Sequence, residues 1–180
     1  EKFEGALATR RDEIEVMRAV DCVLTYSDTE LAVIESYLGL SANVRRLPWI
    51  VASGAALPLE QRDGIVFLGS FDHPPNRDAV EYFLEHCWPQ IRERDQNVKF
   101  HIVGSGFERF ELKEPDPRVE IVGWVEDASA FLGKCRVMVA PLRTGAGVKG
   151  KVFDALVNGT PVVLSQVAAE GIAAGEGCAR

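Results

Sequence analysis

The stretch Val137–Ser165, VMVAPLRTGAGVKGKVFDALVNGTPVVLS, decides the fold of this chain. Val137–Ala140 is a short apolar run typical of a buried parallel strand. Pro141 ends that strand because proline offers no N–H to a sheet. A helix follows a glycine-rich loop, Asn158-Gly159 caps the helix, and Val162–Leu164 predicts the next strand. We expect the helix to carry the following residues on its inner side: Val148, Val152, Phe153, Ala155, Leu156 and Val157.

The glycine-rich loop ahead of this helix is the candidate anion site. Gly145, Ala146 and Gly147 carry almost no side chain, so another molecule can approach the backbone closely. A helix N-terminus points unpaired N–H groups at that molecule, and Lys149 and Lys151 add two full positive charges. We therefore predict a phosphate or diphosphate here. The candidate residues of the loop are Thr144, Gly145, Ala146, Gly147, Val148, Lys149 and Lys151.

Asp154 stands one helical turn after Lys151. Its carboxylate is suited to accept hydrogen bonds from a pair of hydroxyls beside the phosphate, as a ribose presents them. Spacing alone leaves an alternative open. In that alternative the glycines only make a tight turn between strand and helix, both lysines are solvated, and Asp154 is a surface charge.

The segment TGAGVKGKVFDALVNGTPVVLS resembles the signature of the large retaining glycosyltransferase family 4, which has the GT-B fold. The likeness continues upstream in IVFLGSFDHPPNRDAVEYF, KFHIVGSG and VEIVGWVEDASAFLGKCRVMVAPL, and downstream in AAEGI, so it covers roughly residues 64–172. Of the two glutamates typical of that family, the second falls on Asp154 and the first on Ala146. Alanine cannot hydrogen-bond a sugar hydroxyl, so the departure affects the hexose contact and not the nucleotide contact.

The resemblance implies transfer of a sugar from a nucleotide-diphosphate sugar to a sugar, lipid-linked or glycan acceptor, as in polysaccharide biosynthesis. It implies retention at the anomeric carbon, with no required metal and no further cofactor. Lys149 and Lys151 would be the catalytic groups that stabilise the leaving diphosphate, and Asp154 would bind the ribose. The group that orients the acceptor would belong to another domain. We therefore expect this fragment to bind a nucleotide weakly and to turn over nothing alone.

Composition describes an ordinary globular protein and excludes some partners. The 180 residues are 47% hydrophobic and 26% charged, and the formal net charge is -7 with no basic cluster, which argues against nucleic acid. No apolar run approaches the roughly 20 residues that a spanning helix needs. The four cysteines show no C-x-x-C pairing and indicate reduced, buried thiols of a cytoplasmic protein: Cys22, Cys87, Cys135 and Cys178.

The chain pattern predicts two parts joined by a linker. Residues 1–50 resemble the last elements of a mostly missing N-terminal acceptor domain, through which peripheral membrane contact is conceivable. They comprise a helix over Lys2–Val20, a strand at Cys22–Tyr26, a helix that Ser27 or Asp28 caps and that runs to Leu38, and a strand at Val44–Leu47. Residues 51–63 are the predicted linker, and residues 64–180 the nucleotide-sugar-binding domain. Because the chain begins with Glu1, we expect it to be an excised fragment.

The second part alternates strands and helices, which predicts an α/β fold: a doubly wound, Rossmann-like parallel sheet that forms the C-terminal half of a GT-B fold. The predicted strands are 65–68, 100–103, 119–122, 137–140 and 162–164. A long helix over Asn76–Arg94 should kink at Pro89, and Asp127 should cap another helix.

Other loops at the carboxyl ends of the strands complete the predicted site, because open α/β sheets bind ligands there. Gly69 and Ser70 follow the first strand of this sheet and are candidates for donor-phosphate contact. Val125 lies in the loop that resembles the family's base-binding loop. Glu170 matches the family's A-E-G element at the rim of the sugar pocket, although a solvated surface position is the alternative.

Three other functions compete with sugar transfer. A nucleotide-sugar epimerase has the same two-domain fold. A non-catalytic nucleotide-sugar-binding domain is suggested by Ala146. Gly104-Ser105-Gly106 suggests a dinucleotide-binding enzyme, but Arg109 stands where the third glycine is needed.

Overall fold

The computed structural model describes residues 2–39, 43–47, 49–50 and 57–172. The chain divides into two compact units, one of Glu1–Ile50 with Gly171–Arg180 and one of Val51–Glu170. Residues 51–56 of the predicted linker lie outside the described part, as does Cys178. The two units are considered one at a time below.

The first unit contains the predicted helix, strand, helix and strand. These are α1 (Lys2–Ala19), β1 (Val23–Thr25), α2 (Asp28–Leu38) and β2 (Val44–Arg46), and the two strands pair in parallel. The hydroxyl of Ser27 accepts the N–H of Glu30 at 3.0 Å, which confirms Ser27 as the cap of α2. Cys22 is exposed rather than buried, because it precedes β1 on the surface of this unit.

The second unit is built on a five-stranded, all-parallel sheet in the order β5-β4-β3-β6-β7. Its strands match the predicted ones, with β5 one residue longer: β3 (Ile65–Leu68), β4 (Phe100–Val103), β5 (Val119–Gly123), β6 (Val137–Ala140) and β7 (Val162–Leu164). The chain runs outward from β3 to β5 and then returns to the other side of β3 as β6. The strand order therefore reverses between β3 and β6, where such folds bind their ligands.

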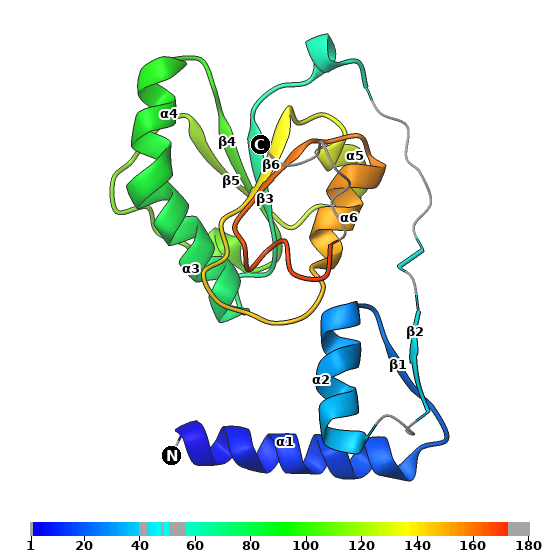
Figure 1. The fold of residues 1–180 in the computed structure, drawn as a ribbon. Helices are drawn as coiled ribbons and strands as arrows, with labels where there is room; N and C mark the ends of the chain where they lie inside the picture. The colour runs from blue at the N-terminus through cyan, green and yellow to red at the C-terminus, as the bar shows by residue number, and fades with distance from the viewer. Residues whose placement is uncertain (1, 40–42, 48, 51–56, 173–180) are drawn as a thin grey trace. The chain divides into compact units, whose positions relative to one another are not determined.

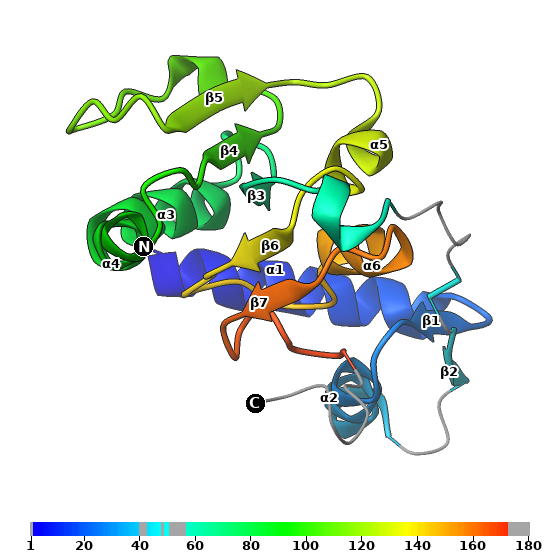
Figure 2. The same cartoon turned by 90° about the horizontal axis from the view of Figure 1, so that it is seen from above.

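Helices cover both faces of this sheet, as Figures 1 and 2 show. The helices α3 (Pro74–Tyr82) and α4 (Trp88–Arg94) lie on one face, and α5 (Ala128–Leu132) and α6 (Gly150–Val157) lie on the other. The side chains between these layers form the core, and the largest fully buried ones include Phe67, Phe100, Phe107, Ile102, Leu132 and Met138. The predicted doubly wound α/β fold is confirmed.

The long helix predicted over Asn76–Arg94 is wrong in detail. It begins two residues earlier, at Pro74, and a π-helical turn at Phe83–Cys87 separates α3 from α4. Pro89 lies in the first turn of α4. Proline lacks the N–H that would donate to the carbonyl four residues earlier, so the α-helical hydrogen bonds are interrupted before Pro89. The helix forms a wider π-helical turn there instead of a kink at the proline.

The helix α6 also differs from its prediction. It begins at Gly150, so Val148 belongs to the loop and not to the inner face of the helix. Val152 and Ala155 are buried as expected, whereas Leu156 is 44% exposed, because it points away from the sheet. Asn158 caps its end, as predicted.

The remaining short elements are the 3-10 turns η1 (Leu59–Gln61) and η3 (Phe107–Arg109). Asp127 caps α5 by accepting the N–H of Ala130 at 2.9 Å. Among the described residues, no helix is both long and apolar enough to cross a bilayer.

Candidate functional site

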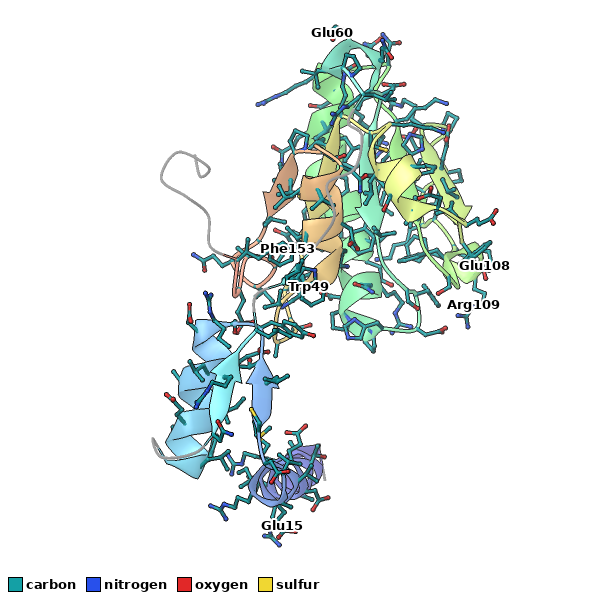
Figure 3. All side chains as sticks on the ribbon, turned by 90° about the vertical axis from the view of Figure 1, so that its right-hand side faces the viewer. Glu15, Trp49, Glu60, Glu108, Arg109 and Phe153 are labelled. Atoms are coloured by element: carbon teal, nitrogen blue, oxygen red, sulfur yellow. The ribbon has the colours of Figure 1, made fainter. Side chains whose placement is uncertain are left out.

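The loops that follow β3, β4, β5 and β6 meet at one edge of the second unit, because all five strands run the same way. Figure 3 marks the two ends of this unit: Glu60, before β3, lies at the end opposite to Arg109, after β4. Gly69, Ser70, Val125 and the loop 141–149 all follow the carboxyl ends of strands. The predicted site residues are therefore on the edge where ligands bind.

The loops after β3 and β4 touch directly through their glycines. The N–H of Gly69 donates to the carbonyl of Val103 at 3.0 Å. A Cβ atom on Gly104 would lie 1.6 Å from the Gly69 carbonyl oxygen, and the φ of Gly104 is +136°. The Ser105 hydroxyl reaches the Ser70 hydroxyl at 3.3 Å. Gly104 therefore makes a tight turn that permits close packing of two loops.

The loop after β6 is fixed at its base and open at its tip. Leu142 is buried, and its carbonyl accepts the Ser165 hydroxyl at 2.5 Å. Thr144, Gly145 and Ala146 are exposed, and residues 147–150 are half-buried. Lys149 is the N-cap of α6 and makes no side-chain capping bond. The N–H of Val152 donates to the Lys149 carbonyl at 2.9 Å, so the amides left for a ligand at this helix start are those of Gly150 and Lys151.

Lys151 is held inside this edge of the sheet. Its Nζ donates to Oδ1 of Asn76 at 2.6 Å and lies 4.5 Å from the ring centroid of Phe67. Burial, with a smaller effect of the nearby Lys149 charge, lowers the pKa of Lys151 to about 8. At neutral pH the group is therefore still protonated, with its positive charge poorly solvated. A bound anion would relieve that cost.

Lys149 lies beside the A-E-G element. Its Nζ donates to the carbonyl of Gly147 and lies 3.7 Å from Oε2 of Glu170. The Lys149 side chain is only 10% exposed. The structure thus brings Glu170 next to the glycine-rich loop, where its carboxylate is the counterion of Lys149.

Asp154 is half-buried on α6, and desolvation by burial raises the pKa of its carboxyl. No described side chain pairs with this carboxylate. Only its backbone carbonyl is engaged, by Nδ2 of Asn158 at 2.7 Å. The carboxylate is therefore a partly desolvated acceptor that hydroxyl groups of a ligand could satisfy.

Sequence reasoning missed two contacts of α3, one with α6 and one with the loop after β6. Asn76 bonds Lys151, and Arg143 forms a paired ion contact with Asp78, including Nε to Oδ2 at 3.0 Å. Hydrogen bonds from Arg143 lower the pKa of Asp78. Asn76 and Asp78 both lie in the first two turns of α3, which starts at the edge of the sheet where ligands bind. Polar side chains at this position in the sequence could have indicated a role at the site.

Val125 is not brought together with the loop after β6. It follows β5, three strands away from β6, which corresponds to about 14 Å at the usual spacing of strands. Its side chain is half-buried against the core. A single ligand that touched both places would have to be extended along the edge of the sheet.

A cavity of this unit lies between α3, α4 and the segment before β5, away from the glycine-rich loop. Its volume is about 440 Å³, and none of the predicted site residues lines it. Asp116 stabilises its floor, where its carboxylate accepts Nε1 of Trp88 at 3.0 Å and also binds Arg92 and Arg118. These bonds, above all those from Arg118, hold the pKa of Asp116 far below its usual value.

The family comparison decides what kind of domain this is. A family model described as glycosyl transferases group 1 matches residues 62–179, well over half of the chain. The chain belongs to this family. No curated protein matches it. The match covers all five strands of the sheet and both lysines of the glycine-rich loop, so the predicted site lies within the family domain.

Solved glycosyltransferase structures share the fold. Staphylococcus aureus TarM, in complex with UDP among other ligands, is 18% identical with a TM-score of 0.69, over 89% of this chain and 33% of TarM. HepE of Anabaena, in complex with UDP and glucose, is 14% identical with a TM-score of 0.62, over 85% of this chain and 46% of HepE. The pneumococcal O-GlcNAc transferase GtfA, with UDP and GlcNAc, is 15% identical with a TM-score of 0.63, over 84% of this chain and 31% of GtfA.

These likenesses show the α/β fold of GT-B glycosyltransferases. The chain spans between about a third and just under half of the length of those solved proteins.

Proposed function

We propose that this group 1 domain binds the nucleotide-diphosphate part of an activated sugar, and that the protein containing it transfers the sugar with retention and without a metal ion. The observation that carries the proposal is Lys151, a protonated and poorly solvated ammonium held by Asn76 of α3 beside the Phe67 ring of β3. It lies beside the uncovered amides of α6, where the strand order reverses. UDP in the solved structures of TarM, HepE and GtfA supports a nucleotide ligand.

The chemical role of the site is to stabilise a leaving group. As the glycosidic bond to the diphosphate breaks, negative charge builds up on the diphosphate oxygens. Lys149, Lys151 and the amides at the start of α6 are suited to balance that charge, and the loss of one such contact typically costs about 3 kcal/mol of transition-state stabilisation. Because these donors are already in place, they need little reorganisation during the reaction.

The other predicted residues would bind the rest of the nucleotide. Gly69 and Ser70 are placed to contact the phosphates from the β3 side, and Asp154 to accept the ribose hydroxyls. Val125 would lie beside the base. Since β5, which precedes Val125, is three strands and about 14 Å from β6, this arrangement requires an extended ligand, and a nucleoside diphosphate is such a ligand. The acceptor, a sugar, lipid-linked sugar or glycan, would be bound by another part of the protein.

Calorimetric titration of the 180-residue chain with UDP and with GDP tests the binding step. We expect one of the two to bind, and Asp154→Ala to weaken that binding about tenfold, because a charged hydrogen-bond acceptor is lost. Asp95→Ala is the control, because this exposed carboxylate accepts the N–H of Asn97 at 2.9 Å before β4, at the edge of the sheet opposite to the site. The proposal is wrong if neither nucleotide binds or if Asp154→Ala leaves the affinity unchanged.

One observation favours a second function, a domain that binds nucleotide sugars without catalysis. Ala146 is exposed at the tip of the loop, where the resembled family has a glutamate, so no carboxylate meets the sugar from this position. Ala146→Glu in the complete protein distinguishes the two. A gain of transfer activity in the variant, with none in the unmodified protein, would favour the non-catalytic domain. Activity in the unmodified protein, with retention established by NMR of the product anomer, would favour the enzyme.

A further inference from the structure

Asn76 is the third residue of α3, and it is only 6% exposed. Both ends of its side-chain amide are engaged: Oδ1 accepts from Lys151 Nζ at 2.6 Å, and Nδ2 donates to the carbonyl of Ser70 at 2.9 Å. An ammonium can only donate and a carbonyl can only accept, so the chemistry of the two partners fixes the orientation of the amide. One buried side chain therefore joins the loop after β3 to the helix α6.

The surroundings leave this amide little freedom. A Cβ atom on Gly69 would lie 2.7 Å from Cγ and Nδ2 of Asn76, so the glycine leaves the space that the amide fills. On the other side of the ammonium lies the Phe67 ring, with 4.5 Å between Nζ and the ring centroid. An ammonium has three N–H donors, and Asn76 takes one. The orientation of the remaining two is set by these neighbours.

The chemistry of an amide matters as much as its position. A carboxylate at this place would bind Lys151 more strongly but would cancel its charge, and an anion would then be bound more weakly. A neutral amide oxygen orients the ammonium and leaves its full charge available. The charged group that affects the pKa of Lys151 is the nearby Lys149, whose own counterion is Glu170. Asp78, two residues after Asn76 on α3, is paired with Arg143.

We propose that Asn76 is a positioning residue: it holds the Lys151 ammonium toward the diphosphate without neutralising it, and joins the loop after β3 and the start of α6 into one anion site. This inference depends on the proposed function for its ligand but not for the contact itself. It assigns to Asn76 a role exerted through Lys151, with no direct contact to the sugar.

The test compares two substitutions of Asn76 with a matched control. Asn76→Asp is nearly isosteric but introduces a charge, and Asn76→Ala removes both hydrogen bonds. Thr160→Val is the control, because the Thr160 side chain is also buried and its hydroxyl also donates to a backbone carbonyl, that of Leu132 at 2.7 Å, but without contact to a proposed site residue. Two quantities are measured in the full chain: the titration of the Lys151 Nζ by NMR with labelled lysine, and the affinity for UDP and GDP by calorimetry.

We expect Asn76→Asp to shift the Lys151 titration to higher pH and Asn76→Ala to shift it to lower pH. Both should weaken nucleotide binding at pH 7 by about tenfold or more, since a charged hydrogen bond is lost or redirected. The control should change neither quantity. A merely structural asparagine would lower stability in the control and in the test variants alike, without changing the affinity of the folded protein for the nucleotide.

Two failures are distinguishable. An unmodified chain that binds neither nucleotide overturns the proposed function, and with it the diphosphate as the target of Lys151. A chain that binds nucleotide, but whose Lys151 titration is unmoved by Asn76→Asp, overturns the role of Asn76 alone. Because Asn76→Asp keeps the size of the side chain, this result is available even if Asn76→Ala does not fold.

Discussion

Replacement of Lys151 by methionine should raise the free energy of unfolding, most of all at pH 7 and less as the pH rises. The same substitution should weaken nucleotide binding. The pKa of Lys151 is lowered from 10.5 to about 8, chiefly because burial removes water from the ammonium. Folding therefore favours the neutral amine, and at pH 7 the folded chain carries the cost of a buried charge. Methionine fills the same channel beside Phe67 with no charge.

The size of the effect follows from proton linkage. Between pH 8 and pH 10.5 the unfolded chain binds a proton that the folded chain has lost, so the stability of the unmodified protein rises with pH. Below pH 8 both states are protonated, and the full penalty applies. The lowered pKa corresponds to about 3 kcal/mol. The variant lacks this contribution, so its advantage should be greatest at pH 7 and should shrink by about 3 kcal/mol by pH 10.5.

The loss of the hydrogen bond to Asn76 opposes this gain in stability, but it does not change with pH in the same way. Without Lys151, Oδ1 of Asn76 has no partner, and an unsatisfied buried acceptor costs about 1–3 kcal/mol. The net gain at pH 7 is therefore about 1 kcal/mol, whereas the change with pH remains near the full value. The pH dependence of the difference between the two proteins is the more informative quantity, since all other groups titrate alike in both.

Urea unfolding followed by circular dichroism at pH 7, 8, 9 and 10 measures this difference, and calorimetry with UDP measures the site. Lys113→Met is the control, because Lys113 is exposed and forms only a surface pair with Glu85, at 3.5 Å. The control should stay within about 0.5 kcal/mol of the unmodified protein at every pH. A flat difference between Lys151→Met and the unmodified protein from pH 7 to pH 10 would refute the reasoning, because it would mean that Lys151 is solvated.

Further outcomes can be measured with the same assays. Asp154→Asn should be more stable than the unmodified protein at pH 7, because burial raises the pKa of this carboxyl and its ionised form costs stability; the gain should vanish as the pH falls below about 4. Asp116→Asn should lower the free energy of unfolding by about 2 kcal/mol at pH 7. This loss should shrink in acid, because the pKa of Asp116 is lowered in the folded protein and its contribution to stability is complete only above about pH 4. Gly104→Ala should lower the free energy of unfolding by more than about 3 kcal/mol, because its Cβ would lie 1.6 Å from the Gly69 carbonyl oxygen. Gly5→Ala should instead stabilise α1 by about 1 kcal/mol, because its Cβ would have no atom within 4 Å.

Local patterns were sufficient to predict the sheet. Each strand of the second unit is mainly apolar and begins directly after glycine, proline or a charged residue, so strand starts follow from neighbours in the sequence. The break at Phe83–Cys87 was harder to predict. Proline removes a hydrogen bond to a carbonyl four residues earlier, and the sequence does not say whether the chain answers with a kink at Pro89 or with a wider turn before it.

The part of the site that lies in one continuous segment of sequence could be predicted. Glycines, lysines and Asp154 stand close together in one segment, so their joint position follows from one loop and one helix. The contact between Asn76 and Lys151 joins residues far apart in the chain, and only the order of the strands brings them together. The same holds for the approach of Glu170 to Lys149. Such pairs depend on the tertiary fold and have no local pattern.

The pairing of β3 with both β4 and β6 also constrains how the chain can be synthesised and shortened. Ile65 pairs with Phe100 on one side but with Val137, far later in the chain, on the other. Until Val137 has left the ribosome, the most apolar strand of the sheet presents an unpaired edge, a surface on which nascent chains associate. Any truncation that ends between β5 and β6 keeps that edge open permanently, and such fragments should aggregate rather than remain as smaller folded domains.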